Sequence, residues 1–245
     1  GDDPMVQFLV ISNNLFPDQR REWAARFVAS DPDNALGAYL MAREHLDAGE
    51  TDAAIAELRR GVGLNKFNDF SKESMFAMET MALELGESVL EGKMRSTLGL
   101  PVPWISQLRE TTEQLMSLQR EATSPNRAEE LALLGAAIGN DLSQGAGDHM
   151  VINRLVGLSV ERRFLQQLDP TIESPFLSDT PRALLADIEA EKQRIQKGTG
   201  GVDSPSLLEA LERLSEPMAN HYLDRVRSLG ALEANAWLQN VLEAQ

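Results

Sequence analysis

The chain has 245 residues, 42% of them hydrophobic and 25% charged, a composition typical of globular proteins that can bury a core. Its formal net charge of −15 would repel phosphate backbones and anionic lipid headgroups, which argues against nucleic acid and membrane surfaces as partners. The absence of cysteine excludes disulfides, thiolate metal sites and cysteine nucleophiles, and it fits a cytoplasmic protein as well as an exported one whose leader has been removed.

The pattern of apolar residues predicts helices throughout. Aromatic residues make up only 5% of the chain, which favours helices over strands. Apolar residues recur every three or four positions between capping and proline signals, as in amphipathic helices. The predicted helices are 5–14, 18–30, 34–48, 52–64, 72–95, 104–122, 126–143, 148–168, 181–197, 205–215, 217–229 and 231–243. No strand is predicted, and no apolar stretch reaches the roughly 18–20 residues that cross a membrane.

Proline and glycine clusters predict where the chain divides. Residues 98–103 contain Gly-Leu-Pro-Val-Pro, a turn that separates a repeat-like region, 1–98, from a helical region, 104–245. Further joints are predicted at 169–180 and 196–204, and the two regions are also compatible with one continuous body. Within the second region, the helix over 148–168 has an apolar face too wide for a surface helix and is predicted to be the central buried helix.

Residues 31–64 read DPDNALGAYLMAREHLDAGETDAAIAELRRGVGL, which predicts two helices joined at Gly49. In its 34-residue length and in its small residues Ala42, Ala54 and Gly61, the segment resembles the tetratricopeptide repeat, a helix-turn-helix unit. The resemblance implies that the two helices cross closely at these small residues. The resemblance implies an all-α fold, either a TPR-like superhelix of α-helices or a helical bundle, with divergent helices in its C-terminal part.

The resemblance also implies a function. Tetratricopeptide proteins hold peptides or partner domains, so the leading hypothesis is a non-enzymatic module or scaffold for protein–protein interaction. The partner-binding residues that it implies lie on the first helix of the repeat: Asn34, Ala38, Met41, Arg43 and His45. The strong acidity of the chain would favour a basic protein or peptide as the partner.

No catalytic, metal or cofactor signature accompanies this pattern. His45, His149 and His221 are isolated and lack the paired spacing that places two metal ligands on one helix face. Among 38 acidic residues, chance pairs on helix surfaces are expected, so no catalytic pair is assigned. Residues 198–201, Gly-Thr-Gly-Gly, lack the Gly-Lys-Ser/Thr ending of a phosphate-binding loop and are predicted to be a connector.

Two alternative functions are compatible with the sequence. An exported helical enzyme or small-ligand-binding protein would have its site in a cleft between the two helical regions. A structural subunit of an assembly would instead leave a large apolar surface exposed in the monomer. Phe76 and the methionines near it, Met75, Met78 and Met81, suit an adaptable apolar contact surface, and packing against a neighbouring helix explains them equally well.

Overall fold

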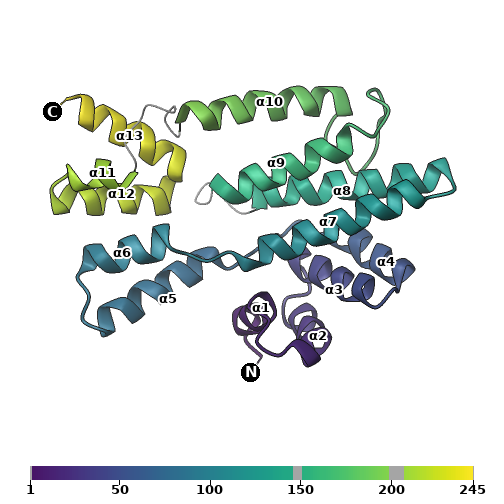
Figure 1. The fold of residues 1–245 in the computed structure, drawn as a ribbon, viewed down its shortest axis with the longest axis horizontal. Coiled ribbons are helices and arrows are strands. Elements are labelled where there is room, and N and C mark those ends of the chain that lie inside the picture. The colour runs from purple at the N-terminus through teal and green to yellow at the C-terminus, as the bar shows by residue number, and fades with distance from the viewer. Residues whose placement is uncertain (1, 146–150, 199–206, 245) are drawn as a thin grey trace. The chain divides into compact units, whose positions relative to one another are not determined.

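The computed structural model describes residues 2–145, 151–198 and 207–244, and it confirms the predicted all-α class. Figure 1 shows the helices, and the described ranges contain no β-strand, only one isolated bridge between Asn34 and Lys66. No helix in these ranges is long and apolar enough to cross a membrane. The predicted helices 126–143 and 181–197 are both present and start at Pro125 and Pro181, whereas the predicted start at residue 205 lies outside the described residues.

Helices make up most of the described residues. In chain order they are α1 (Pro4–Ser12), the 3-10 turn η1 (Pro17–Gln19), α2 (Arg20–Ser30), α3 (Ala35–Asp47), α4 (Thr51–Val62), α5 (Ser71–Glu84), α6 (Val89–Leu98), α7 (Pro103–Glu121), α8 (Pro125–Gly145), α9 (Val151–Leu165), α10 (Pro181–Gly198), α11 (Leu207–Glu212), α12 (Glu216–Leu229) and α13 (Ala231–Glu243).

The single helix predicted over 72–95 is wrong, because the chain turns between α5 and α6. Gly86 adopts a left-handed conformation with φ of 88°, which favours glycine. Ser88 then caps α6 in a capping box: its hydroxyl accepts a hydrogen bond from the Glu91 amide, and the Glu91 carboxylate accepts one from the Ser88 amide at 2.9 Å. The Ser-x-x-Glu pattern of this capping box can be read in the sequence, but the apolar spacing of the predicted helix continues on both sides of it.

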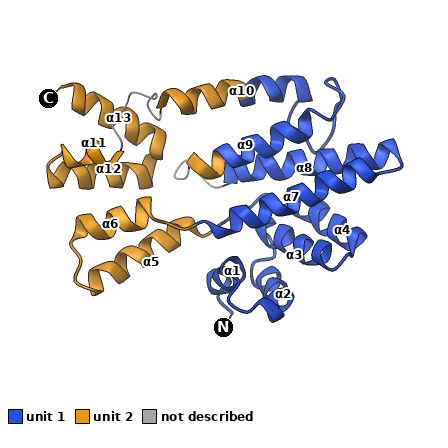
Figure 2. Ribbon diagram, viewed as in Figure 1, with its two compact units in different colours: residues 1–69, 102–145, 155–188 blue, residues 70–101, 146–154, 189–245 orange. Residues whose placement is uncertain are grey.

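The chain separates into two compact units, coloured in Figure 2. Unit 1 comprises residues 1–69, 102–145 and 155–188, and unit 2 comprises 70–101, 146–154 and 189–245. The predicted joint at 98–103 contains one of the points where the chain passes from one unit to the other, between residues 101 and 102. The predicted regions 1–98 and 104–245 have different boundaries from the two units. The difference arises because the α5–α6 pair, which belongs to unit 2, interrupts the helix pairs of unit 1.

Unit 1 is built from helix pairs. Helices α1 and α2, α3 and α4, and α7 and α8 pack as antiparallel neighbours, while α3 also packs on α7 and α4 on α8. The predicted close crossing within the α3–α4 pair is present: Tyr39 is fully buried, and a Cβ added to Gly61 would lie only 2.4 Å from its ring. A side chain at Gly61 would therefore force these two helices apart.

The most continuously buried helix of unit 1 is α8, not α9 as predicted. Every residue from Leu131 to Gly139 is buried, whereas α9 alternates buried residues with exposed ones such as Ile152 and Ser159. The two helices touch backbone to backbone, since a Cβ on Gly139 would lie 2.3 Å from the Glu161 amide nitrogen. The α8 sequence is rich in alanine and glycine, and these small residues permit the close contact. Because they also make the apolar face of α8 less prominent in the sequence than that of α9, the width of the apolar face did not identify α8 as the buried helix.

Unit 2 has a core of its own. Helices α12 and α13 pack together around Tyr222, Leu223 and Leu238, and α6 packs on α12. Also within unit 2, the largely buried side chain of Arg227 on α12 pairs with Glu79 and donates a hydrogen bond to the Thr97 hydroxyl at 2.9 Å. The buried guanidinium therefore has partners on both α5 and α6.

Candidate functional site

Two of the five sequence-predicted partner residues have structural roles. Asn34 is 1% exposed and caps α3: its Oδ1 accepts a hydrogen bond from the Leu36 amide at 3.2 Å, and its Nδ2 donates one to the Asn68 carbonyl at 2.9 Å. Ala38 is completely buried between helices. Neither side chain is open to a partner in this structure.

The other three lie at the edge of α3, where the chain's own residues engage two of them. Arg43 pairs with Asp47 at 3.6 Å and with Glu110 of α7. His45 Nδ1 lies 2.6 Å from a Glu50 carboxylate oxygen, which also accepts a hydrogen bond from Arg21. Hydrogen bonds from Arg21 and then His45 lower the pKa of Glu50 to about 2. Met41 is half-buried.

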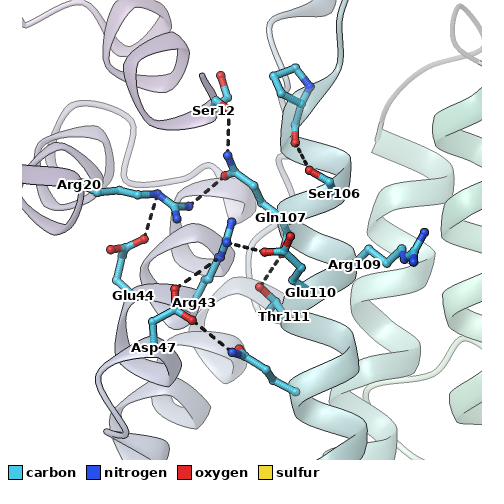
Figure 3. A network of polar contacts seen from close by, with 12 residues as sticks. Ser12, Arg20, Arg43, Glu44, Asp47, Ser106, Gln107, Arg109, Glu110 and Thr111 are labelled. Carbon is cyan, nitrogen blue, oxygen red and sulfur yellow. Dashed lines mark hydrogen bonds and ion pairs between the residues drawn. The ribbon is translucent and has the colours of Figure 1, made fainter. Parts of the chain in front are cut away.

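The contacts of Arg43 belong to a polar network that connects α7 to the N-terminal helices, shown in Figure 3. The largely buried Arg20 lies 3.2 Å from Glu44 and donates a hydrogen bond to the side-chain carbonyl of Gln107 at 3.0 Å. Gln107 in turn donates one to the Ser12 carbonyl at 2.9 Å. Burial lowers the pKa of Arg20 and raises that of Glu44, so the network is desolvated. Its chemistry is that of a helix–helix interface.

The other face of α7 lines an open pocket. Arg109 in Figure 3 points away from the network, and it shares this second face with Thr112, Glu113 and Met116, at helical spacing. Across the pocket, α9 contributes Leu155, Val156, Ser159, Val160, Arg163 and Phe164. The pocket has a volume of about 340 Å³ and lies entirely within unit 1. We call it the α7–α9 pocket.

The α7–α9 pocket combines an apolar floor with a charged rim. Phe164 and Val160 are buried, and Phe164 packs against the backbone of α8 at Gly135. At the rim, Arg109 Nε donates a hydrogen bond to Glu113 at 3.1 Å, one turn along α7. Arg163 is exposed, and its side chain forms no hydrogen bond or ion pair with the described residues. Such a pocket can hold an apolar group beside a polar or anionic one.

The sequence reasoning missed this pocket. The helical spacing of Arg109, Thr112, Glu113 and Met116 was available, but a mixed polar and apolar helix face is the ordinary appearance of a solvated surface. Only the packing of α7 and α9 within unit 1 shows that the two faces enclose a common space.

A second feature of unit 1 is a pair of poorly solvated carboxyl groups, of which Glu161 is buried and Asp141 is half-buried. Burial raises the pKa of Asp141 on α8 to about 6, and burial together with the Asp141 charge raises that of Glu161 on α9 to about 7. The Tyr39 hydroxyl donates a hydrogen bond to Asp141, and burial raises the pKa of this tyrosine. Asp141 also lines a second pocket of about 590 Å³, together with Asn65 and Lys66. A carboxyl group with such a pKa can exchange a proton near neutral pH.

Neither feature is accompanied by a metal-binding group. Within the described ranges, no three histidine, aspartate or glutamate side chains are grouped so that they could hold a metal ion. His149 lies outside the described residues, and His221 stacks edge-on against Trp237 with ring centroids 5.0 Å apart.

Comparison with known proteins adds no relative to this picture. No protein-family model matches the chain, and neither the curated proteins nor the solved structures give a significant match.

Proposed function

We propose that this protein is a non-enzymatic interaction module that holds a segment of a partner protein in the α7–α9 pocket. The observation that carries the proposal is the pocket itself: a buried apolar floor at Val160 and Phe164 below an open, charged rim at Arg109 and Arg163. Recognition sites for peptide segments combine such an apolar anchor position with a few polar groups that fix orientation.

The arrangement of unit 1 supports this function. Helices α3 and α4 stack on α7 and α8, as successive pairs do in helical-repeat proteins, which use the resulting surfaces to bind partners. The resemblance of residues 31–64 to the tetratricopeptide repeat points the same way. We therefore place the binding surface on α7 and α9 and give the α3–α4 pair the role of supporting α7.

The residues that line the pocket favour binding over catalysis. Among the described residues that line it, Glu113 is the only carboxylate and is paired with Arg109, and none is a histidine. Ser159 therefore has no general base among the lining residues. A volume of about 340 Å³ is at the lower end of the roughly 300–1,000 Å³ usual for ligand pockets, which suits one or two anchoring side chains.

The proposal is tested by selecting peptides from a displayed random library against the full chain and measuring their affinities by fluorescence anisotropy. The substitution Ser159→Trp fills the pocket from its exposed edge, whereas Gln166→Trp adds the same ring at an exposed position outside it. We expect Ser159→Trp to weaken binding about tenfold or more and Gln166→Trp to leave it unchanged. Equal affinities for both variants and the wild type would refute the proposed site.

A second candidate function, an enzyme with Asp141 as its acid–base group, is favoured by the pKa of about 6 and by the 590 Å³ pocket that this residue lines. Its test is a screen of the wild type against a panel of ester, amide and glycoside substrates. Turnover that is lost in Asp141→Asn would establish it, and a panel without Asp141-dependent turnover would reject it.

A further inference from the structure

The charge of the α7–α9 pocket is opposite to that of the whole chain. The chain carries a formal charge of −15, but the pocket is lined by two arginines and one glutamate. Salt screens exposed charges beyond about 8–10 Å, so a bound segment is influenced chiefly by the groups that line the pocket. Charges on the surface farther away are largely screened, so the groups that line the pocket determine which side chains are accepted.

The two arginines differ in what they can offer to a ligand. Arg109 is partly engaged, because its Nε already donates a hydrogen bond to Glu113. Arg163 is exposed and unpaired with any described residue, so its five N–H donors can all be offered to a ligand. On α9 it directly precedes Phe164, whose ring is in the pocket floor. One bound segment can therefore contact the apolar floor and the free guanidinium together.

Resting on the function proposed above, we propose that the segment held in the α7–α9 pocket carries an apolar side chain for the floor and, close to it, an aspartate or glutamate side chain that pairs with Arg163. The guanidinium fork matches a carboxylate in a bidentate, charge-assisted geometry. The overall charge of the chain favours a basic partner, but the side chain that this pocket selects is acidic. A basic protein can satisfy both if it presents an acidic residue next to an apolar one.

The test is a double-mutant cycle on the selected peptides. Each acidic residue of a peptide is replaced by its amide, and affinity is measured for wild type, Arg163→Gln and Arg162→Gln. Arg162 is the matched control, an exposed neighbour on the same turn that does not line the pocket. We expect the amide peptide to bind wild type and Arg162→Gln about fivefold more weakly or worse, but to bind Arg163→Gln as well as the acidic peptide does.

The other outcomes overturn the inference in distinguishable ways. If Ser159→Trp abolishes binding but the selected peptides lack an acidic residue, or show no coupling to Arg163, the pocket binds a partner and the acidic specificity is wrong. The acidic side-chain specificity is also wrong if the coupling to Arg163 is lost when the C-terminal carboxylate of the peptide is amidated but is kept when its acidic side chains are replaced. If Ser159→Trp binds like the wild type, or no peptide is selected, the proposed function fails and this inference fails with it.

Discussion

Glycine residues bring α8 and α9 into backbone contact, and this contact sets the position of the pocket floor. A Cβ on Gly139 would lie 2.3 Å from the Glu161 amide nitrogen, and one on Gly157 would lie 2.4 Å from that of Ser143. Because the obstructing atoms belong to the backbone, no side-chain rotation can relieve them. Phe164, three residues after Glu161, is held against α8 by the same approach.

We predict that Gly139→Ala destabilises unit 1 by roughly 1–3 kcal/mol, since the helices must separate to accommodate the methyl group. The control is Gly63→Ala, where the nearest atoms lie at 3.4 Å and φ is −79°, so alanine fits without strain. The measurement is urea denaturation followed by circular dichroism. A midpoint for Gly139→Ala equal to that of the control would contradict the close helix crossing.

At the same scale, Asn34 has a structural role that the repeat resemblance does not imply. The resemblance assigns it a partner contact on the first helix of the repeat, whereas its buried side chain caps α3 and donates a hydrogen bond to the Asn68 carbonyl. The cap was predictable from the local pattern. The bond to Asn68 was not, because it joins residues 34 positions apart that only the fold brings together.

At the scale of elements, α8 and α9 each contribute a poorly solvated carboxyl group, the half-buried Asp141 and the buried Glu161. Burial raises the pKa of Asp141 from 3.8 to about 6 and that of Glu161 from 4.5 to about 7. The folded state therefore binds protons more tightly than the unfolded state, so the free energy of unfolding falls as pH rises through this interval. Tyr39 faces Asp141 from α3 and partly offsets the cost by donating a hydrogen bond.

We predict that the melting temperature falls as pH is raised from 5 to 8. Glu161→Gln should remove much of this dependence and, at pH 8, stabilise the protein by roughly 2–3 kcal/mol, because the neutral amide avoids burying a charge. The control is Glu189→Gln, at an exposed position on α10, which should retain the wild-type slope. Thermal unfolding of the three proteins at pH 5, 6, 7 and 8 checks this. A Glu161→Gln profile as steep as that of the wild type would show that Glu161 is ionised without penalty.

Elements were predictable where periodicity and capping agreed, and less so where packing decides. The start of α8 at Pro125 and that of α10 at Pro181 follow directly from proline after a capping residue. The break at Gly86 was overlooked because apolar spacing continues across it. The pocket-lining face of α7 could not be recognised, because its mixture of Arg109, Thr112 and Met116 acquires meaning only opposite α9.

For the whole molecule, the sequence indicated an all-α chain with a repeat-like start, but not the interleaving of its two units. Residues 31–64 contain α3 and α4, whereas the next helix pair of unit 1, α7 and α8, begins only after the α5–α6 pair of unit 2. The net charge of −15 is likewise a property of the whole chain that does not describe the arginine-bearing pocket.

The central claim, that the α7–α9 pocket is where a partner segment binds, is most directly tested by methyl NMR of the protein labelled at its methionines. Met116 lines the pocket, whereas Met75 is buried in unit 2, and substitution of each by leucine assigns its resonance. On addition of a selected peptide, we predict a saturable shift of the Met116 methyl resonance and no shift for Met75. A Met116 resonance that stays fixed while the peptide is bound would contradict the claim.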